Sequence, residues 1–291
     1  MQNSLALIDP AAGTFAVADP TAAHLRVDDL APHRGDGIFE TVLITLHPDG
    51  THAVHAQGPH FARFRNSAEI LELPVPDETL FHAALDAVVE DFRAKNPEAT
   101  ALSVRYSLSR GLDTPSAWAL TIPLDPKYAE QQVNGIRVVT LDKGYDAYLS
   151  ESAPWLLIGA KTLSYATNQA AGRYAAAQGA DDALFVSHDG ILLEGPTSNL
   201  VIRRGEELVT PDPKAGILHG TTQRTVFAHA AEAGLLTSYG DLRLEDLKNA
   251  DGAWLVSSVR AAVPITAVDG TDIAVDSELT ARMNDWILTN P

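Results

Sequence analysis

The sequence predicts an α+β fold divided into two domains. Strand-like and helix-like segments are mixed along its 291 residues, without the regular strand–helix–strand alternation of a doubly wound sheet. The length exceeds the roughly 150 residues of a typical domain, and a polar stretch around Pro126 interrupts the chain. We therefore expect a small amino-terminal α+β domain over residues 1–125, a linker over residues 126–135 and a larger carboxy-terminal domain over residues 136–291.

The first half begins with a hairpin signal. Asp49 and Gly50 separate two runs rich in β-forming residues, and an Asp-Gly pair in that position favours a tight turn, so we expect a hairpin from Gly37 to Ala56. Apolar residues at helical spacing follow, and then two strand-like runs. They predict two helices and two strands, over residues 60–73, 77–95, 102–109 and 116–123.

The second half continues to mix the two kinds of element. An alanine-rich helix is expected over residues 167–178, because Gly179 is suited to a helix end. Strands are expected before and after it, over residues 136–141, 183–187, 191–194, 199–204, 253–258 and 263–268. Further helices are expected over residues 221–233 and 244–250 and near the carboxy terminus.

Composition limits the classes of function and of partner. The formal net charge is −17, which opposes binding to a phosphate backbone or an anionic membrane, so we expect neither a nucleic-acid nor a membrane partner. No apolar run reaches the roughly 18 residues that a membrane span needs, and the first residues lack the pattern of a secretion signal, which favours the cytoplasm. The absence of cysteine excludes disulfides and thiolate chemistry.

One of the six lysines has different surroundings from the others. Lys161 is the only charged residue between Glu151 and Arg173. Loss of hydration lowers the pKa of a lysine and makes its neutral, nucleophilic amine accessible, as chemistry on a carbonyl group requires. A lysine that buries its stem and reaches water has the same pattern, so both interpretations stay open. The other lysines lie among charged or turn residues and are expected to be solvated: Lys95, Lys127, Lys143, Lys214 and Lys248.

Two later segments have the residues to hold an anion and a nitrogen heterocycle. Thr221 and Thr222 follow a glycine and open a helix pattern, so hydroxyl and backbone N–H groups at the positive end of a helix dipole would meet a phosphate. An ordinary helix cap has the same pattern. Glu194 ends an apolar run before a Gly-Pro turn, and Ser198 and Asn199 begin the next strand. An exposed acid at a turn is the alternative for Glu194.

Several ordered segments together resemble the class IV family of pyridoxal-phosphate enzymes, which has the two-domain fold type IV of D-amino-acid aminotransferase. In the second half they are KTLSYATN from Lys161, DGILLEGPTSNLVI around Glu194, GILHGTTQRTVF and SSVRAAVP. In the first half they are RGDGIFETV, HFARFRNSAEIL and RYSLSRG. The resemblance covers most of the chain and implies that pyridoxal 5′-phosphate is the cofactor.

The resemblance also implies roles for individual residues. Lys161 would bind the cofactor covalently and later move protons, and Glu194 would pair with the pyridine nitrogen. The remaining cofactor-binding residues would be Arg63, Thr221, Thr222 and Ser258 on the phosphate, Tyr165 on the phenolic oxygen, and Ser198 and Asn199 beside Glu194. Arginine suits a phosphate because its planar guanidinium group donates two parallel hydrogen bonds. Gln223 and Ser164 depart from residues that are frequent in the family, which leaves details of the pocket open.

In this family the first half of the chain supplies the wall of the substrate pocket, so its residues indicate which substrate is bound. Leu43 lies where branched-chain aminotransferases carry an arginine, and the residues after Arg110 and Gly111 lack the arginine and histidine with which D-amino-acid aminotransferases hold a carboxylate. The motifs are most similar to those of aminodeoxychorismate lyases, which release pyruvate from 4-amino-4-deoxychorismate and leave 4-aminobenzoate for folate biosynthesis. Arg105 is the expected anchor for a carboxylate of this small-molecule substrate, with Arg34 and Arg110 as further candidates.

Other interpretations stay open at this point. A class IV aminotransferase acting on branched-chain or D-amino acids would use Lys161 in the same way, and Arg105 would serve equally well in an ion pair on a strand. His52 and His55 form an HxxH pattern, but residues three apart on a strand point to opposite faces, so we expect no metal site. A non-catalytic binding module is a further alternative, although the residues for cofactor chemistry are all present. By resemblance we expect a homodimer.

Overall fold

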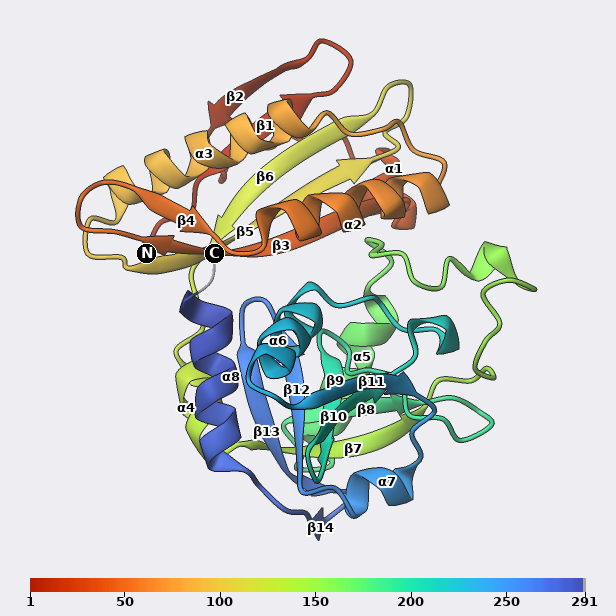
Figure 1. Cartoon of the computed structure of the whole chain (residues 1–291). Helices are drawn as coiled ribbons and strands as arrows, with labels where there is room; N and C mark the ends of the chain where they lie inside the picture. Colours follow the sequence, from red (N-terminus) through yellow and green to blue (C-terminus); the bar gives the residue numbers. More distant parts are fainter. Residues whose placement is uncertain (290–291) are drawn as a thin grey trace. The chain divides into compact units, whose positions relative to one another are not determined.

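The computed structural model describes residues 1–289, which form two compact units (Figure 1). Unit 1 contains Met1–Asp125 and also Ala160–Tyr165. Unit 2 contains Pro126–Gly159 and the described chain from Ala166 onwards. Both units combine helices and strands, so the α+β class predicted from the sequence is confirmed.

Unit 1 is an antiparallel sheet with two long helices on one face (Figure 1). Its strands, in the order β2-β1-β6-β5-β3-β4, are β1 (Leu5–Asp9), β2 (Thr14–Ala18), β3 (Gly37–Leu46), β4 (His52–Val54), β5 (Ala101–Ser109) and β6 (Ser116–Ile122). The helices are a short α1 (Leu30–Arg34), α2 (Gln57–Ile70) and α3 (Glu78–Lys95). Helix α2 packs against β3, and helix α3 packs against β1, β2 and β6. The predicted hairpin, both long helices and the two later strands are confirmed; β1 and β2 were not predicted.

The helix-covered face of this sheet is the core of unit 1. Asp77 begins α3 as an N-cap, because its side chain accepts a hydrogen bond from the backbone N–H of Leu80 at 3.1 Å. Aromatic side chains fill the space between helices and sheet, with Phe64 of α2 5.0 Å from Tyr106 of β5 and 5.2 Å from Phe81 of α3 between ring centroids. Alternation along β3 places Glu40 on this buried face, among apolar neighbours.

Unit 2 is a mixed sheet covered by helices. Its strands, in the order β11-β10-β9-β12-β13-β7-β8 with β14 on β13, are β7 (Ile136–Asp142), β8 (Asp182–Val186), β9 (Asn199–Arg204), β10 (Glu207–Pro211), β11 (Leu236–Gly240), β12 (Gly252–Ser257), β13 (Ala261–Val268) and β14 (Thr271–Asp272). Its helices are α4 (Lys127–Asn134), α5 (Ala166–Ala177), α6 (Thr221–Glu232), α7 (Leu244–Lys248) and α8 (Ser277–Thr289). The central strands β9 and β12 contribute buried apolar residues to two separate core clusters, as expected for strands covered on both faces.

Two segments of unit 2 differ from the sequence-based expectation. Residues 126–135, expected as a linker, contain α4, which packs against β13; alanine, glutamate and glutamine favour a helix despite the polarity of the stretch. Residues 191–194, expected as a strand, make only isolated bridges. The segment does run antiparallel beside the end of β8, since the N–H of Leu193 donates to the Phe185 carbonyl oxygen and the N–H of Phe185 donates to the Glu194 carbonyl oxygen, but this pairing is too short to form a regular ladder.

Candidate active site

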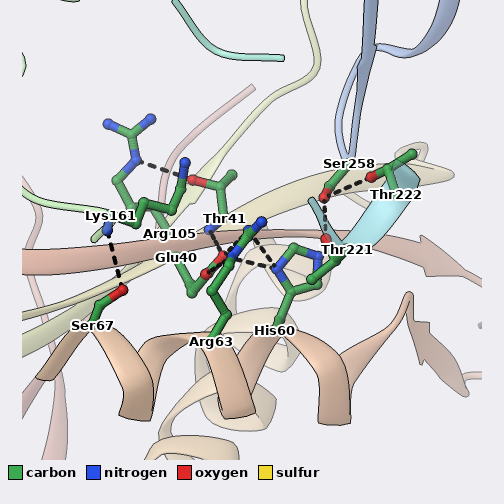
Figure 2. Close-up of polar contacts among 10 residues, drawn as sticks. All are labelled: Glu40, Thr41, His60, Arg63, Ser67, Arg105, Lys161, Thr221, Thr222 and Ser258. Atoms are coloured by element: carbon green, nitrogen blue, oxygen red, sulfur yellow. Dashed lines mark hydrogen bonds and ion pairs between the residues drawn. The ribbon is translucent and has the colours of Figure 1, made fainter. Parts of the chain in front are cut away.

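Lys161 lies in unit 1, on a short segment beside the first residues of β3. The N–H of Phe39 donates to the Lys161 carbonyl oxygen at 3.0 Å, and the N–H of Leu163 donates to the Gly37 carbonyl oxygen at 2.8 Å. The N–H of Lys161 donates to Oγ of Ser67 on α2 at 3.1 Å (Figure 2). These bonds fix the backbone on both sides of Lys161 and so fix the origin of its side chain.

The side chains of Lys161 and Arg105 meet at one aromatic ring. Nζ of Lys161 lies 4.5 Å from the ring centroid of Phe39, and Cζ of Arg105 lies 4.7 Å from the same centroid. Nε of Arg105 also donates to Oγ1 of Thr41 at 3.3 Å (Figure 2), since Thr41 of β3 and Arg105 of β5 are register partners. The aromatic ring attracts cations to its face. The candidate proton-transfer group and the candidate carboxylate anchor therefore both lie against the ring of Phe39.

A buried charge cluster lies on the helix-covered face of the same sheet. Oε1 of Glu40 accepts from Nε of Arg63 at 2.6 Å, Oε2 accepts from Nη2 of Arg63 at 2.8 Å, and Nδ1 of His60 lies 2.8 Å from Oε2 (Figure 2). Glu40 and His60 are almost completely buried. Burial alone would raise the pKa of Glu40, but Arg63 and His60 hold that pKa well below its usual range. Burial lowers the pKa of His60, and the contact with Glu40 opposes this shift.

The other candidates of unit 1 have different surroundings. Tyr165 packs its ring edge-on against Phe39, with 5.3 Å between centroids, and so joins the aromatic group around Lys161. Arg110 forms an ion pair with Asp36 at 2.7 Å and also donates to the carbonyl oxygens of Leu71 and Glu72, which favours a structural role over substrate binding. Arg34 is exposed at the end of α1.

In unit 2, three hydroxyl groups converge at the start of α6. Gly220 is the N-cap residue and makes no side-chain cap, as the sequence pattern predicts for a helix that begins at Thr221. Oγ of Ser258 lies 3.4 Å from Oγ1 of Thr221 and 3.2 Å from Oγ1 of Thr222 (Figure 2). Both threonines are buried. Hydroxyl donors at the positive end of a helix dipole form a suitable site for a phosphate group.

Glu194 lies in the same unit, and its carboxylate is held from two sides. Oε2 accepts from Nδ2 of Asn199 at 3.1 Å, and Oε1 accepts from the backbone N–H of Leu218 at 3.2 Å. Nδ2 of Asn199 also donates to the Leu218 carbonyl oxygen at 2.8 Å, which fixes the amide. Ser198 is buried just before Asn199. A carboxylate fixed in this way is suited to pairing with the protonated nitrogen of a heterocycle.

A family model for amino-transferase class IV matches residues 37–268, which include the hairpin of unit 1 and most of unit 2. The chain belongs to the aminotransferase class IV family. It is therefore an enzyme of a family that depends on pyridoxal phosphate, either a lyase or an aminotransferase. The resemblance inferred from the sequence motifs is confirmed.

Known proteins similar to this class IV enzyme include both lyases and transaminases by name. The chain is 38% identical over 262 residues to the bifunctional aminodeoxychorismate lyase / D-amino acid transaminase of Mycobacterium tuberculosis, covering 87% of this chain and 89% of the relative. The structure of the fold IV-transaminase CpuTA1 from Curtobacterium pusillum is similar with a TM-score of 0.91 and 41% identity, over 99% of this chain and 98% of that chain. The fold of the class IV enzyme is thus fold type IV.

A further similar structure contains the cofactor. It is the PLP-bound form of a hypothetical aminotransferase from M. tuberculosis, with a TM-score of 0.87 and 34% identity over 94% of this chain and 96% of that chain. The class IV enzyme has residues that fit such a group. Glu194 is fixed by two hydrogen bonds, and an ideal Cβ on Gly220 would lie 1.9 Å from Oδ1 of Asn199, so the start of α6 leaves room for no larger residue.

One expectation about the lysines of the class IV enzyme is wrong. Lys143, expected to be solvated, is half-buried, and its Nζ lies 3.8 Å from the ring centroid of Phe185. Burial lowers the pKa of Lys143, and Glu194 opposes this shift. The cause is the backbone: the N–H of Lys143 donates to Val186, which places Lys143 beside the strand that carries Phe185.

Sequence reasoning missed the two residues that hold Arg63. Glu40 was part of the GDGIFETV motif and His60 opened the segment with Arg63, but neither was assigned a role. A single acid within the otherwise uncharged predicted strand from Gly37 was the available signal, because such an acid is buried only with a partner. The two histidines of the HxxH pattern contact different partners. His52 lies 3.1 Å from Asp86, and His55 lies 2.8 Å from Oγ1 of Thr45.

Within residues 1–289 no group of three or more histidines and acids is arranged to hold a metal ion. No helix in the same part of the chain is long and apolar enough to cross a membrane.

Proposed function

We propose that this class IV enzyme is an aminodeoxychorismate lyase, which converts 4-amino-4-deoxychorismate to 4-aminobenzoate and pyruvate. The observation that carries the proposal is the meeting of Lys161 and Arg105 at Phe39. A proton-transfer group beside a carboxylate anchor suits a substrate that carries carboxylates and gives up a proton from carbon. The name of the M. tuberculosis relative includes this lyase activity, which supports the same choice.

The proposed cofactor is pyridoxal 5′-phosphate. Thr221, Thr222 and Ser258 would donate hydrogen bonds to its phosphate, together with Arg63, whose guanidinium group Glu40 keeps in one orientation. Glu194 would accept a hydrogen bond from the ring nitrogen, and Tyr165 would donate to the phenolic oxygen. When bound, the cofactor supplies an electron sink for the bond that breaks.

In the proposed reaction the residues of the chain bind the substrate and move protons. Arg105 would hold a substrate carboxylate. Lys161 would remove the proton from the ring carbon, the carbon–oxygen bond to the enolpyruvyl group would break, and the ring would become aromatic. The released enolpyruvate would take up one proton to become pyruvate. No oxidant or reductant is required, because the two products contain all the atoms of the substrate.

Transamination of D-amino acids is the second candidate. The names of the M. tuberculosis relative and of CpuTA1 both include a transaminase activity. Lys161 would then remove the proton from the α-carbon of the amino acid, and Arg105 would hold its carboxylate. The two functions thus share the same two residues, and the substrate distinguishes them.

The test is incubation of the purified enzyme, with pyridoxal phosphate added, with 4-amino-4-deoxychorismate and separately with D- or L-amino acids and 2-keto acids. We expect pyruvate and 4-aminobenzoate in equal amounts. Amino transfer with no 4-aminobenzoate would replace the proposed function by the second candidate. Absence of a visible band that borohydride bleaches, even with added pyridoxal phosphate, would contradict both.

A further inference from the structure

The turn that carries Ser258 is held in an unfavourable backbone conformation. Residues 258–260 connect β12 to β13, and Ala261 has φ = 58°, in the left-handed region that favours glycine. Nε2 of Gln132 donates to the Arg260 carbonyl oxygen at 3.0 Å, and Asn284 bonds both backbone groups of Ala262. Such a conformation persists where several contacts fix it, which is frequent at binding sites.

Arg260 adds two further hydrogen bonds through its side chain. The residue is 8% exposed, and its Nη2 donates to Oδ2 of Asp182 at 2.8 Å and to Oγ of Ser198 at 3.2 Å. Its Nε has no hydrogen-bond partner in the described part of the chain. A buried ion pair with one donor unsatisfied contributes little to stability compared with apolar side chains of similar size. A role other than stabilisation is therefore expected for Arg260.

The two partners of Arg260 connect it to Glu194. Ser198 closes the turn that begins directly after Glu194, because the N–H of Gly195 donates to the Ser198 carbonyl oxygen at 2.8 Å. The turn is tight: a Cβ on Gly195 would lie 2.9 Å from Oγ of Ser198. Arg260 thus joins the turn that carries Ser258 to the turn that follows Glu194, entirely within unit 2.

We infer that Arg260 is a positioning residue that fixes the spacing between the phosphate-binding hydroxyl of Ser258 and the carboxylate of Glu194. The inference rests on the proposed cofactor, which requires a phosphate site and a ring-nitrogen partner at one fixed spacing. A ligand with both groups gains affinity when both sites are engaged together, and it loses that gain when their spacing varies. A ligand with the ring alone does not depend on the spacing.

The test compares the affinity of the apoenzyme for pyridoxal phosphate and for pyridoxal, which lacks the phosphate. The variant is the double substitution Arg260→Met with Asp182→Asn, which removes both charges and leaves neither one buried alone. We expect the affinity for pyridoxal phosphate to fall about tenfold, while the affinity for pyridoxal changes little. Arg260→Lys keeps the charge and loses the planar fork, and we expect an intermediate fall.

The matched control is the double substitution Arg203→Met with Asp276→Asn. Arg203 of β9 forms an ion pair with Asp276 elsewhere in unit 2, and both are partly buried. We expect a lower melting temperature and an unchanged ratio of the two affinities. An unchanged ratio in both Arg260 variants, with normal binding of pyridoxal phosphate to the wild-type enzyme, would overturn the inference alone. Failure of the wild-type enzyme to bind pyridoxal phosphate would instead overturn the proposed function.

Discussion

Lys161 and Lys143 both lie beside a phenylalanine ring, yet only Lys161 has Arg105 at the same ring. The two lysines therefore provide a matched pair. Replacement of Lys161 by alanine is expected to lower turnover by about a thousandfold or more and to remove the visible band that borohydride bleaches. Lys143→Gln is expected to retain the band and most of the turnover. Steady-state kinetics and absorbance spectra of the two variants measure this, and loss of the band in Lys143→Gln alone would reverse the assignment.

Glu40 is expected to be important for stability as well as for the site. Replacement by glutamine leaves the guanidinium group of Arg63 without a buried counter-charge, so we expect the free energy of unfolding to fall by about 3 kcal/mol. Asp36→Asn, which breaks the half-exposed pair with Arg110, is expected to change it by less than about 1 kcal/mol. Urea denaturation measures both, and equal effects would show that burial of Glu40 has no energetic role.

The lowered pKa of His60 predicts how the free energy of unfolding depends on pH. Its pKa is lower in the folded protein than in the unfolded chain, so the unfolded state binds more protons as the pH falls below about 6.5. The free energy of unfolding should therefore decrease between pH 7 and pH 5. Glu40, whose pKa is also lowered, adds a further loss only at more acidic pH.

The control for this pH dependence is His60→Asn, which keeps a polar group near Glu40 but does not titrate. Its free energy of unfolding is expected to depend less steeply on pH over the same range. His188, whose pKa Asp142 raises, contributes with the opposite sign, but it is present in both proteins and cancels in the comparison. Equal slopes in the two proteins would contradict the prediction.

At the scale of single elements, the start of α6 depends on the absence of a side chain at Gly220. A Cβ there would lie 1.9 Å from Oδ1 and 2.8 Å from Cγ of Asn199, the residue that orients Glu194. Gly220→Ala is therefore expected to lower the affinity for pyridoxal phosphate by more than about tenfold. Gly172→Ala in α5, where nothing lies within 4 Å of the added Cβ, is expected to be neutral or slightly stabilising. Titration of the apoenzymes and thermal unfolding compare them.

The elements with strong periodicity could be predicted from the sequence, and those that depend on distant partners could not. The α3 helix has an N-cap at Asp77 and a clear apolar face, and its predicted start and end agree with the structure within one residue. In contrast, β11 has largely exposed or half-buried residues and is a strand because it pairs with β10. The apolar run at residues 191–194 has a strand composition, but its pairing with the end of β8 is short and forms only isolated bridges.

The residues of the candidate site also differ in whether the local sequence or a distant partner reveals them. Lys161, Glu194 and the two threonines of α6 were identified from motifs, because each has a local signature in the sequence. The bonds of Glu40 to Arg63 and of Arg260 to Asp182 join residues 23 and 78 positions apart, and only the fold brings such residues together.

At the scale of the whole molecule, the net charge of −17 predicts how the cofactor approaches. Pyridoxal phosphate is an anion and is repelled by the overall field at low ionic strength. Raising the salt concentration from about 10 to about 150 mM shortens the screening length, so we expect the association rate constant to rise several-fold. Stopped-flow absorbance measures it, with pyridoxal as the control whose rate should change less. A fall in the rate would indicate that the local arginines dominate the field.

The return of the chain to unit 1 at Ala160–Tyr165 affects how this protein can be recombined. A crossover at the apparent boundary near Pro126 would transfer Lys161 with unit 2 while leaving β3, Ser67 and Arg105 behind. A chimaera between two relatives would then combine a lysine segment from one parent with a supporting strand from the other. To exchange substrate preference between two relatives, residues 1–125 and residues 160–165 should therefore be transferred together, from the same parent.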